Sequence, residues 1–293
     1  MDYFSISQLQ QFSGIKAHTI RIWEQRYNAL IPTRSEGNTR HYDNKQLIRL
    51  LNIVSLLDTG YKISEVGVMT DQMHTQLLEK QLKAKEIKDS DNEYFITQLI
   101  AASVSFDEIH FEKIFSNCVL KLGMKSTYTE VIYPMMIRIG LMWVSGTFSP
   151  AYEHFSSNII KQKLYSAIDS MEPATTDENW LLFLPENEFH DIGLLLSNHL
   201  IRQAGKNVIF LGGNIPYETL MKLSDEINPS HLLFFLVHND NIEDLNGYIK
   251  SLTNKFSKSK IHISGNEKLM IKLKDENEFN WIKSVDDLEK QLY

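Results

Sequence analysis

An acidic residue, a histidine and a glycine lie at short spacing in the segment Glu188-Phe189-His190-Asp191-Ile192-Gly193. A neutral imidazole nitrogen can bind a metal or act as a general base, and a carboxylate two positions earlier can hold the other ring N–H. A glycine lets the backbone approach a large flat ligand closely. The pattern is short, so three interpretations stay open here: a metal ligand, a catalytic base, or a histidine in a solvated loop.

A second group of suitable side chains lies upstream, where Trp143 is followed by nine residues and then by Glu153-His154. An indole can cover one face of a flat ligand, and a carboxylate with an imidazole can hydrogen-bond sugar hydroxyls. The structural alternatives are a helix-packing role for Trp143 and, for Glu153-His154, the first turn of a helix beginning at Pro150. Each alternative is the stronger one for its own residues alone. Together with His190 and the domain order described below, these residues favour the functional interpretation.

The residues around His190 alternate between continuous apolar runs and helical patterns. The runs at 179–185, 207–213, 231–239 and 260–266 have the composition of buried strands, and helical stretches lie at Ile192–Gln203, Pro216–Ile227 and Asn241–Phe256. This alternation predicts a flavodoxin-like, doubly wound parallel sheet over residues 178–293. Ligands of such sheets bind beyond the carboxyl ends of the strands, and His190 follows the first of them.

Residues 93–172 contain four amphipathic helical patterns, which start near Glu93, Asp107, Met124 and Ser149 and are divided by Gly, Pro, Ser or Asp residues. Short loops between such helices predict a four-helix bundle. Residues 73–92 are polar with a thin apolar stripe, which indicates the end of a helix followed by a linker.

The first 72 residues indicate short helices with tight turns. Helical patterns on either side of Gly14 give a helix-turn-helix outline, and the turn formers Pro32, Gly37 and Asn38 are flanked by arginines. The net charge of the whole chain is −7, yet residues 1–70 carry eight Lys/Arg and only six Asp/Glu. A basic head on an acidic body is expected if only the head contacts DNA.

The order "SISQLQQFSGIKAHTIRIWEQRYNALIPTRSEGNTRHYD" resembles the winged-helix DNA-binding domain of MerR-type regulators. The resemblance implies that the helix around Ala17–Gln25 enters the major groove and that a homodimer or larger homo-oligomer binds a two-fold double-stranded operator. Trp23 and Tyr27 are expected to pack in the core or against other helices instead of contacting bases. The side chains expected at the DNA are Lys16, His18, Thr19, Arg21, Arg26, Arg34, Arg40, His41 and Tyr42. Of these, Arg34, Arg40 and Tyr42 are expected to contact the DNA backbone from the wing.

A helical bundle followed by a parallel sheet, with Glu188-x-His190-x-x-Gly193 after the first strand, resembles the cobalamin-binding module. The resemblance implies that His190 binds cobalt from below. The spacing Trp143-x9-Glu153-His154 is similar to that in light-sensing, adenosylcobalamin-dependent MerR-type regulators of the CarH and LitR kind, where adenosylcobalamin promotes a tetramer that light disrupts. The residues expected at adenosylcobalamin are Trp143, Glu153, His154, Glu188, His190, Asp191, Gly193, Gly212 and Gly265.

Three positions depart from that pattern. The family's light-sensing members have a histidine after the tryptophan that can capture cobalt, and this chain has Val144. Where the module has Ser-x-Leu along the lower nucleotide tail, this chain has Phe235-Leu236-Val237, and the later Gly-Gly is reduced to Ser264-Gly265. The residues expected to face the corrin ring are kept, whereas those expected to face the tail are altered, and Phe235 could partly fill the tail pocket.

The composition, with 43% hydrophobic and 23% charged residues, is that of an ordinary globular protein. No apolar run approaches the roughly 20 residues of a membrane helix, and no signal peptide is evident. A single cysteine, Cys118, excludes an intrachain disulfide and argues against a cysteine-based zinc site. The chain is therefore expected in the cytoplasm without a membrane partner.

Three functions are compatible with these residues. The favoured one is a cobalamin-responsive transcription factor, not an enzyme, with a modified tail site. The second is a MerR-type regulator whose module has lost cobalamin, or binds another tetrapyrrole, and acts through protein contacts. The third is a cobalamin enzyme subunit such as a methyltransferase or mutase, against which the DNA-binding head and the lack of a segment for a substrate domain both argue.

Overall fold

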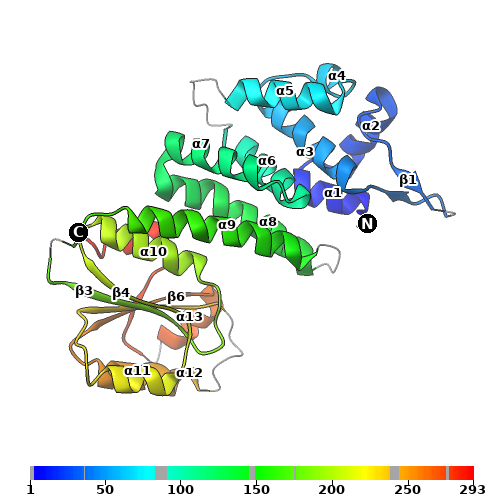
Figure 1. Ribbon diagram of the computed structural model, residues 1–293. Helices are drawn as coiled ribbons and strands as arrows, with labels where there is room; N and C mark the ends of the chain where they lie inside the picture. Colours follow the sequence, from blue (N-terminus) through cyan, green and yellow to red (C-terminus); the bar gives the residue numbers. More distant parts are fainter. Residues whose placement is uncertain are drawn as a thin grey trace. The chain divides into compact units, whose positions relative to one another are not determined.

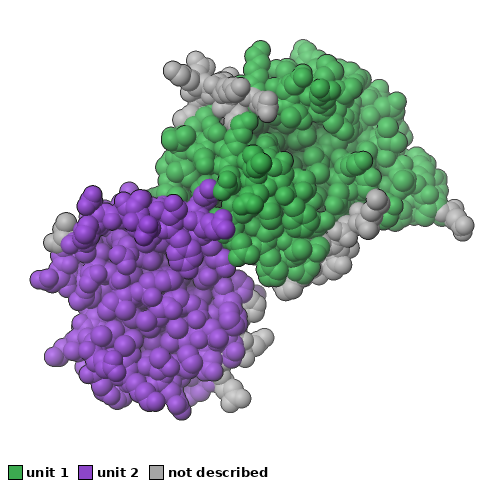
Figure 2. Space-filling view, viewed as in Figure 1, with its two compact units in different colours: residues 1–159 green, residues 160–293 purple. Residues whose placement is uncertain are grey.

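The computed structural model describes residues 3–35, 37–82, 91–144, 149–174, 176–237, 244–274 and 277–293. The chain forms two compact units, residues 1–159 and 160–293 (Figures 1 and 2). The first unit holds the N-terminal helices and most of a helical region. The second holds the end of that region and a parallel sheet.

The N-terminal part of the first unit is helical with one short hairpin. Its elements are α1 (Ile6–Ser13), α2 (Ala17–Tyr27), β1 (Thr33–Arg34), β2 (Arg40–His41), α3 (Asn44–Asp58), α4 (Ile63–Val66) and α5 (Asp71–Leu82). Ser5 caps α1 in a capping box with Gln8, and Gly14 ends it at a φ of 71°. The strands β1 and β2 pair antiparallel, as the hairpin prediction expects. The helix predicted around Ala17–Gln25 is α2.

The helical region contains α6 (Asp91–Ser105), α7 (Glu108–Ser126), η1 (Thr127–Ile132), α8 (Tyr133–Val144) and α9 (Pro150–Asp169). The sequence predicts a plain helix from Met124 onward, and the structure instead has the π-helical segment η1 before α8. The amide of Tyr133 bonds to the carbonyl of Tyr128, five residues earlier. Pro134 follows and has no N–H to donate to a helical carbonyl, so the wider π turn accommodates it.

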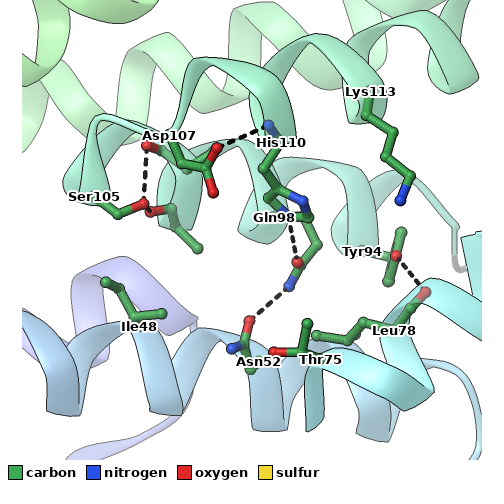
Figure 3. A pocket seen from close by; sticks show the side chains of 12 residues that line it. Ile48, Asn52, Thr75, Leu78, Tyr94, Gln98, Ser105, Asp107, His110 and Lys113 are labelled. Atoms are coloured by element: carbon green, nitrogen blue, oxygen red, sulfur yellow. Dashed lines mark hydrogen bonds between the residues drawn. The ribbon is translucent and has the colours of Figure 1, made fainter. Parts of the chain in front are cut away.

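Polar side chains join α3 to the helical region within the first unit (Figure 3). Gln98 of α6 is 1% exposed, and its Nε2 donates to Oδ1 of Asn52 at 3.0 Å and to Oγ of Ser55 at 2.9 Å. Its Oε1 lies 3.1 Å from Nε2 of His110 on α7. These groups border a cavity of about 170 Å³. Because a buried amide is costly unless it is fully bonded, this contact fixes how α3 packs on α6.

The second unit is built on a five-stranded parallel sheet. Its elements are β3 (Asn179–Pro185), α10 (Ile192–Gln203), β4 (Asn207–Ile215), α11 (Tyr217–Leu223), β5 (His231–Leu236), α12 (Leu245–Lys255), β6 (Lys260–Gly265), α13 (Glu267–Lys274), β7 (Asn280–Trp281) and α14 (Val285–Glu289). The strand order β4-β3-β5-β6-β7 is that of flavodoxin-like sheets. The doubly wound parallel sheet is therefore present as predicted, with β7, α13 and α14 added to the predicted elements.

The two faces of the sheet carry different layers (Figure 1). Phe183, Leu232 and Phe234 belong to a core shared with α11, α12 and α13. Since successive strand residues point to opposite faces, Leu233 and Phe235 lie on the other face, where α10 packs against β3 and β4. The position of Phe235 on the α10 face matters for the site described below.

A buried histidine pair lies at the amino end of the strands. Trp180 stacks on His231 with ring centroids 4.1 Å apart, and Nδ1 of His231 is 2.8 Å from Nε2 of His262. Nε2 of His231 is 3.0 Å from a carboxylate oxygen of Glu178. Burial, with smaller contributions from His231 and Lys260, lowers the pKa of His262 to about 3. The pair is therefore neutral in the folded chain at neutral pH.

This pair predicts that the second unit loses stability in mild acid. His262 charges in the unfolded chain below its ordinary pKa of 6.5 but stays neutral in the folded chain down to about 3. Its stabilising contribution is therefore complete above pH 6.5 and falls as the pH decreases, by about 2 kcal/mol from pH 7 to pH 5. His262→Gln, which keeps an N–H donor but does not titrate, should flatten this part of the pH profile in urea unfolding. An unchanged profile in the variant would contradict the assignment.

Candidate functional site

The turn after β3 is organised by Glu188, whose side chain is buried. Its Oε1 accepts from the amides of Phe189 and His190 at 3.0 and 3.1 Å and lies 2.5 Å from Nδ1 of His190. Its Oε2 accepts from the amide of Val237, at the end of β5, at 3.1 Å. One buried carboxylate therefore joins the turn after the first strand to the end of its neighbour.

The same contact sets the chemistry of His190. Because a carboxylate oxygen can only accept, Nδ1 of His190 is the donor in this contact, and in the neutral ring the lone pair is then on Nε2. The His190 side chain is 55% exposed, so the imidazole is presented at the carboxyl edge of the sheet. Among the described residues no group of three or more His, Cys, Asp or Glu could hold a metal ion. A single imidazole of this kind suits a metal that arrives with most of its ligands in place, as in a tetrapyrrole.

The end of β4 is attached to the same turn. The amide of Asn214 donates to the carbonyl of Glu188 at 3.1 Å, and its side chain accepts from the amide of Asn187 at 2.9 Å. Gly212, predicted to contact the ligand, lies at a φ of 80° in an irregular stretch of β4 where the pairing with β3 slips by one residue. Only a glycine adopts this backbone without strain, so its first role is to bend β4 toward the turn.

Gly193 lies in the first turn of α10, against Phe235 of β5. A Cβ placed on Gly193 would lie 2.6 Å from Cε2 of Phe235, closer than atoms of folded proteins approach. The sequence predicts that Gly193 lets a ligand approach, and the structure places the chain's own phenylalanine ring there. Ser264 is the register partner of Phe235 on β6. The two altered tail positions are thus neighbours, as the sequence comparison with the module suggests.

The other predicted residues of the second unit have structural surroundings as well. Asp191 precedes α10, and its Oδ1 lies 3.5 Å from Nζ of Lys161. A Cβ on Gly265 would meet the carbonyl oxygen of Leu236 at 2.5 Å, so the close pairing of β5 and β6 accounts for this glycine. Ligand contact by these two residues stays a prediction.

The predicted residues of the helical region are partly described. Glu153 and His154 lie in the first turn of α9, with Oε2 of the glutamate 3.1 Å from Nδ1 of the histidine. The His154 side chain is 72% exposed. Trp143 and Val144 end α8, and their side chains lie outside the described part of the chain. The motif therefore spans the end of α8 and the start of α9, and the position of the Trp143 indole stays a prediction.

The surface of α2 carries most of the residues predicted to contact DNA. Lys16, His18, Arg21 and Arg26 are exposed and Thr19 is half-buried, while Arg34 is exposed on the hairpin and His41 is half-buried. Trp23 is 8% exposed and packs in the interior, as predicted. The side chains placed outward on α2 can reach a nucleic acid without rearrangement.

The structure contradicts the predicted backbone contact of Tyr42. Its ring is fully buried, and its hydroxyl donates to a carboxylate oxygen of Glu24 at 3.0 Å. Burial and the Glu24 carboxylate raise the pKa of Tyr42, so the hydroxyl stays a donor. Nε of Arg40 also donates to Glu24 at 3.0 Å, which leaves the arginine only 21% exposed. The lone acidic residue on an otherwise basic α2 was the available signal for this network, which ties the hairpin to α2.

Comparison with known families agrees with this architecture. Residues 4–73 match the MerR HTH family regulatory proteins, and residues 91–167 match the B12 binding domain. The chain therefore combines an N-terminal segment of the MerR HTH type with a helical segment that matches the B12 binding domain. Within the described residues, no helix has both the length and the apolar character needed to cross a membrane.

Two relatives are similar to the chain over most of its length. It is 25% identical to the HTH-type transcriptional repressor CarH of Myxococcus xanthus over 244 residues, which cover 82% of this chain and 81% of that protein. It is 24% identical to the repressor CarA of the same organism over 226 residues, covering 76% and 73% of the two chains. The solved structure of the Methanosarcina barkeri monomethylamine corrinoid protein covers 69% of this chain and 98% of its own, with a TM-score of 0.53 and 13% identity, which shows a shared fold.

The contacts of Glu188 predict a local effect of its removal. Glu188→Ala should leave the amides of Phe189, His190 and Val237 without their acceptor, at a cost of about 2 kcal/mol to the local structure. Their hydrogen exchange, followed by mass spectrometry, should become at least about tenfold faster. The exposed Glu186 lies in the same turn, so Glu186→Ala is the matched control and should leave these amides unchanged. Equal exchange in the two variants would refute the role given to Glu188.

Proposed function

We propose that this regulator binds a corrinoid through His190 and that the bound corrinoid changes its binding to an operator. The observation that supports this most is the hydrogen bond between Nδ1 of His190 and the buried carboxylate of Glu188. It holds the ring in one orientation with Nδ1 as the donor, which leaves Nε2 as the nitrogen suited to bind a metal.

A corrinoid would supply a cobalt ion that still accepts a nitrogen ligand. His190 would hold that cobalt through Nε2, and Glu188 would hold the imidazole through Nδ1. Trp143, Glu153 and His154 are the proposed contacts for the upper face and for the 5′-deoxyadenosyl group of adenosylcobalamin. Val144 offers no metal ligand, so a light response in this chain would not proceed through a histidine at that position.

The DNA side of the proposal rests on α2 and the hairpin. Exposed cationic side chains on α2, with Arg34 on the hairpin, would contact phosphates and the major groove. Arg40 stays a proposed contact to the DNA backbone, held against α2 by Glu24. A homodimer or larger homo-oligomer would place two such heads on a two-fold operator. Through the Gln98 contact between α3 and α6, a change in the helical region would alter the packing of α3, which belongs to the DNA-binding domain.

One observation favours a second candidate function. Phe235 fills the space over Gly193, where the cobalamin-binding module was expected to admit a ligand. A regulator whose module has lost cobalamin, and which responds through protein contacts, would also show this feature. The two candidates differ in whether the purified protein retains a corrinoid.

The corrinoid proposal is tested by absorption spectroscopy in the dark. The purified full chain, mixed with excess adenosylcobalamin and separated from free ligand by gel filtration, should retain the chromophore with a histidine-ligated spectrum. His190→Ala should lose that spectral signature, whereas His18→Ala, an exposed histidine on α2, should leave it unchanged. A wild-type protein without retained chromophore would overturn this proposal in favour of the second candidate.

The DNA proposal is tested with a fragment that the protein selects from a random pool. Arg21→Ala should weaken binding about tenfold and lower the salt dependence by about one counterion, because it removes one phosphate neutralisation. Lys268→Ala changes the same charge on the exposed surface of the second unit and should leave both quantities as in the wild type. An equal loss of DNA affinity in the two variants would show that α2 is not the DNA-binding surface.

A further inference from the structure

The ring of Phe235 covers the first turn of α10 beside His190. Three of its atoms, Cε2, Cδ2 and Cζ, lie 2.6, 3.4 and 3.5 Å from where a Cβ of Gly193 would be. Gly193 is three residues after His190 and lies within α10, and its carbonyl also accepts from the hydroxyl of Ser197 at 2.9 Å. The phenylalanine and the glycine are therefore packed as a complementary pair, and the backbone of α10 has no room left on that side.

The contact between Phe235 and Gly193 matters because a complete cobalamin carries a nucleotide loop. Its nucleotide loop hangs from the lower face of the ring, and in the free cofactor its benzimidazole binds the cobalt. A protein imidazole that takes the lower position displaces the benzimidazole but leaves it tethered on the same face, which is the face turned toward the protein. The displaced loop then needs space next to His190. On the β5 side of α10 that space is occupied by Phe235.

The neighbouring position along β5 on this face is filled as well. Leu233, two residues earlier on the same face of β5, is fully buried. On β6 the register partner of Phe235 is the half-buried Ser264, whereas Gly265 lies on the opposite face, against Met270 of α13. On the α10 face of β5, directly below the turn that presents His190, the space is therefore filled by the side chains of Leu233 and Phe235.

We propose that this site binds corrinoids through their macrocycle and cobalt and excludes the lower nucleotide, so that tailless corrinoids of the cobinamide class are ligands at least as good as cobalamin. The proposal rests on the corrinoid binding proposed above. Phe235 is the residue that sets the specificity. A tailless corrinoid also lacks the tethered benzimidazole that competes with His190 for the cobalt, so its ligation carries no displacement cost.

The test compares two ligands that differ only in the tail. Titration of the full chain in the dark with adenosylcobinamide and with adenosylcobalamin, followed by absorbance, should give the tailless ligand equal or tighter binding. Phe235→Ser removes the ring and should tighten adenosylcobalamin binding about tenfold, equivalent to about 1.4 kcal/mol, with less than about threefold change for adenosylcobinamide. Phe235→Leu, which keeps an apolar side chain at the site, is the control for folding and should retain the wild-type preference.

The titrations distinguish a failure of the specificity from a failure of corrinoid binding. If the wild-type chain binds adenosylcobalamin tenfold or more tightly than adenosylcobinamide, the nucleotide contributes to binding and the exclusion by Phe235 is wrong, while corrinoid binding itself stands. If neither ligand binds, the proposed corrinoid function fails and the specificity fails with it. A Gly193→Ala variant that is destabilised with Phe235 but tolerated with Phe235→Ser would independently confirm the packed pair.

Discussion

A buried carboxylate must have its hydrogen-bonding capacity filled, and the edge of the sheet is arranged around that requirement at Glu188. The side chain accepts from amides of its own turn, from the ring of His190 and from the end of β5. Its main-chain carbonyl accepts from Asn214 at the end of β4. Three strand ends are thereby held at one point. The imidazole of His190 is therefore positioned by its own turn, and that turn is fixed to the ends of β4 and β5.

The first unit uses the same principle for a different purpose. Glu24 accepts from Arg40 and Tyr42, which fixes the hairpin on α2. Gln98 of α6 bonds to α3 through its side-chain nitrogen and to His110 of α7 through its side-chain oxygen. Buried polar groups of this kind allow one packing arrangement and penalise others, because a shift leaves them unsatisfied. Such contacts are suited to pass a change in the helical region to the DNA-binding elements.

Local sequence signals were sufficient for much of this architecture. The helix predicted at Ile192–Gln203 is α10, the first helix ends at Gly14 as expected, and four strands lie where continuous apolar runs occur. The spacing Glu188-x-His190 also placed the acid on the imidazole correctly. These features depend on periodicity, capping or neighbours in the chain, which a single sequence contains.

Features that depend on distant residues were not predicted. The strand β7 has only two residues and no apolar run of its own. The burial of Tyr42 follows from a glutamate eighteen positions away, and the sequence alone left it on the surface. Phe235 was recognised as a departure, but its contact with Gly193 joins a strand to a helix more than forty residues away in the chain. Such pairs are decided by the tertiary fold, where the packing of one side chain can determine which ligand fits.

The identity of the nitrogen on cobalt is the most direct test of the account. Electron paramagnetic resonance of the full chain loaded with cob(II)alamin resolves the superhyperfine coupling of the axial nitrogen. Protein grown with 15N-labelled histidine should convert each three-line pattern of 14N into the two-line pattern of 15N, and His190→Ala should abolish the conversion. A three-line pattern unchanged by the label would show that the benzimidazole of the cofactor stays on the cobalt, and would contradict ligation by His190.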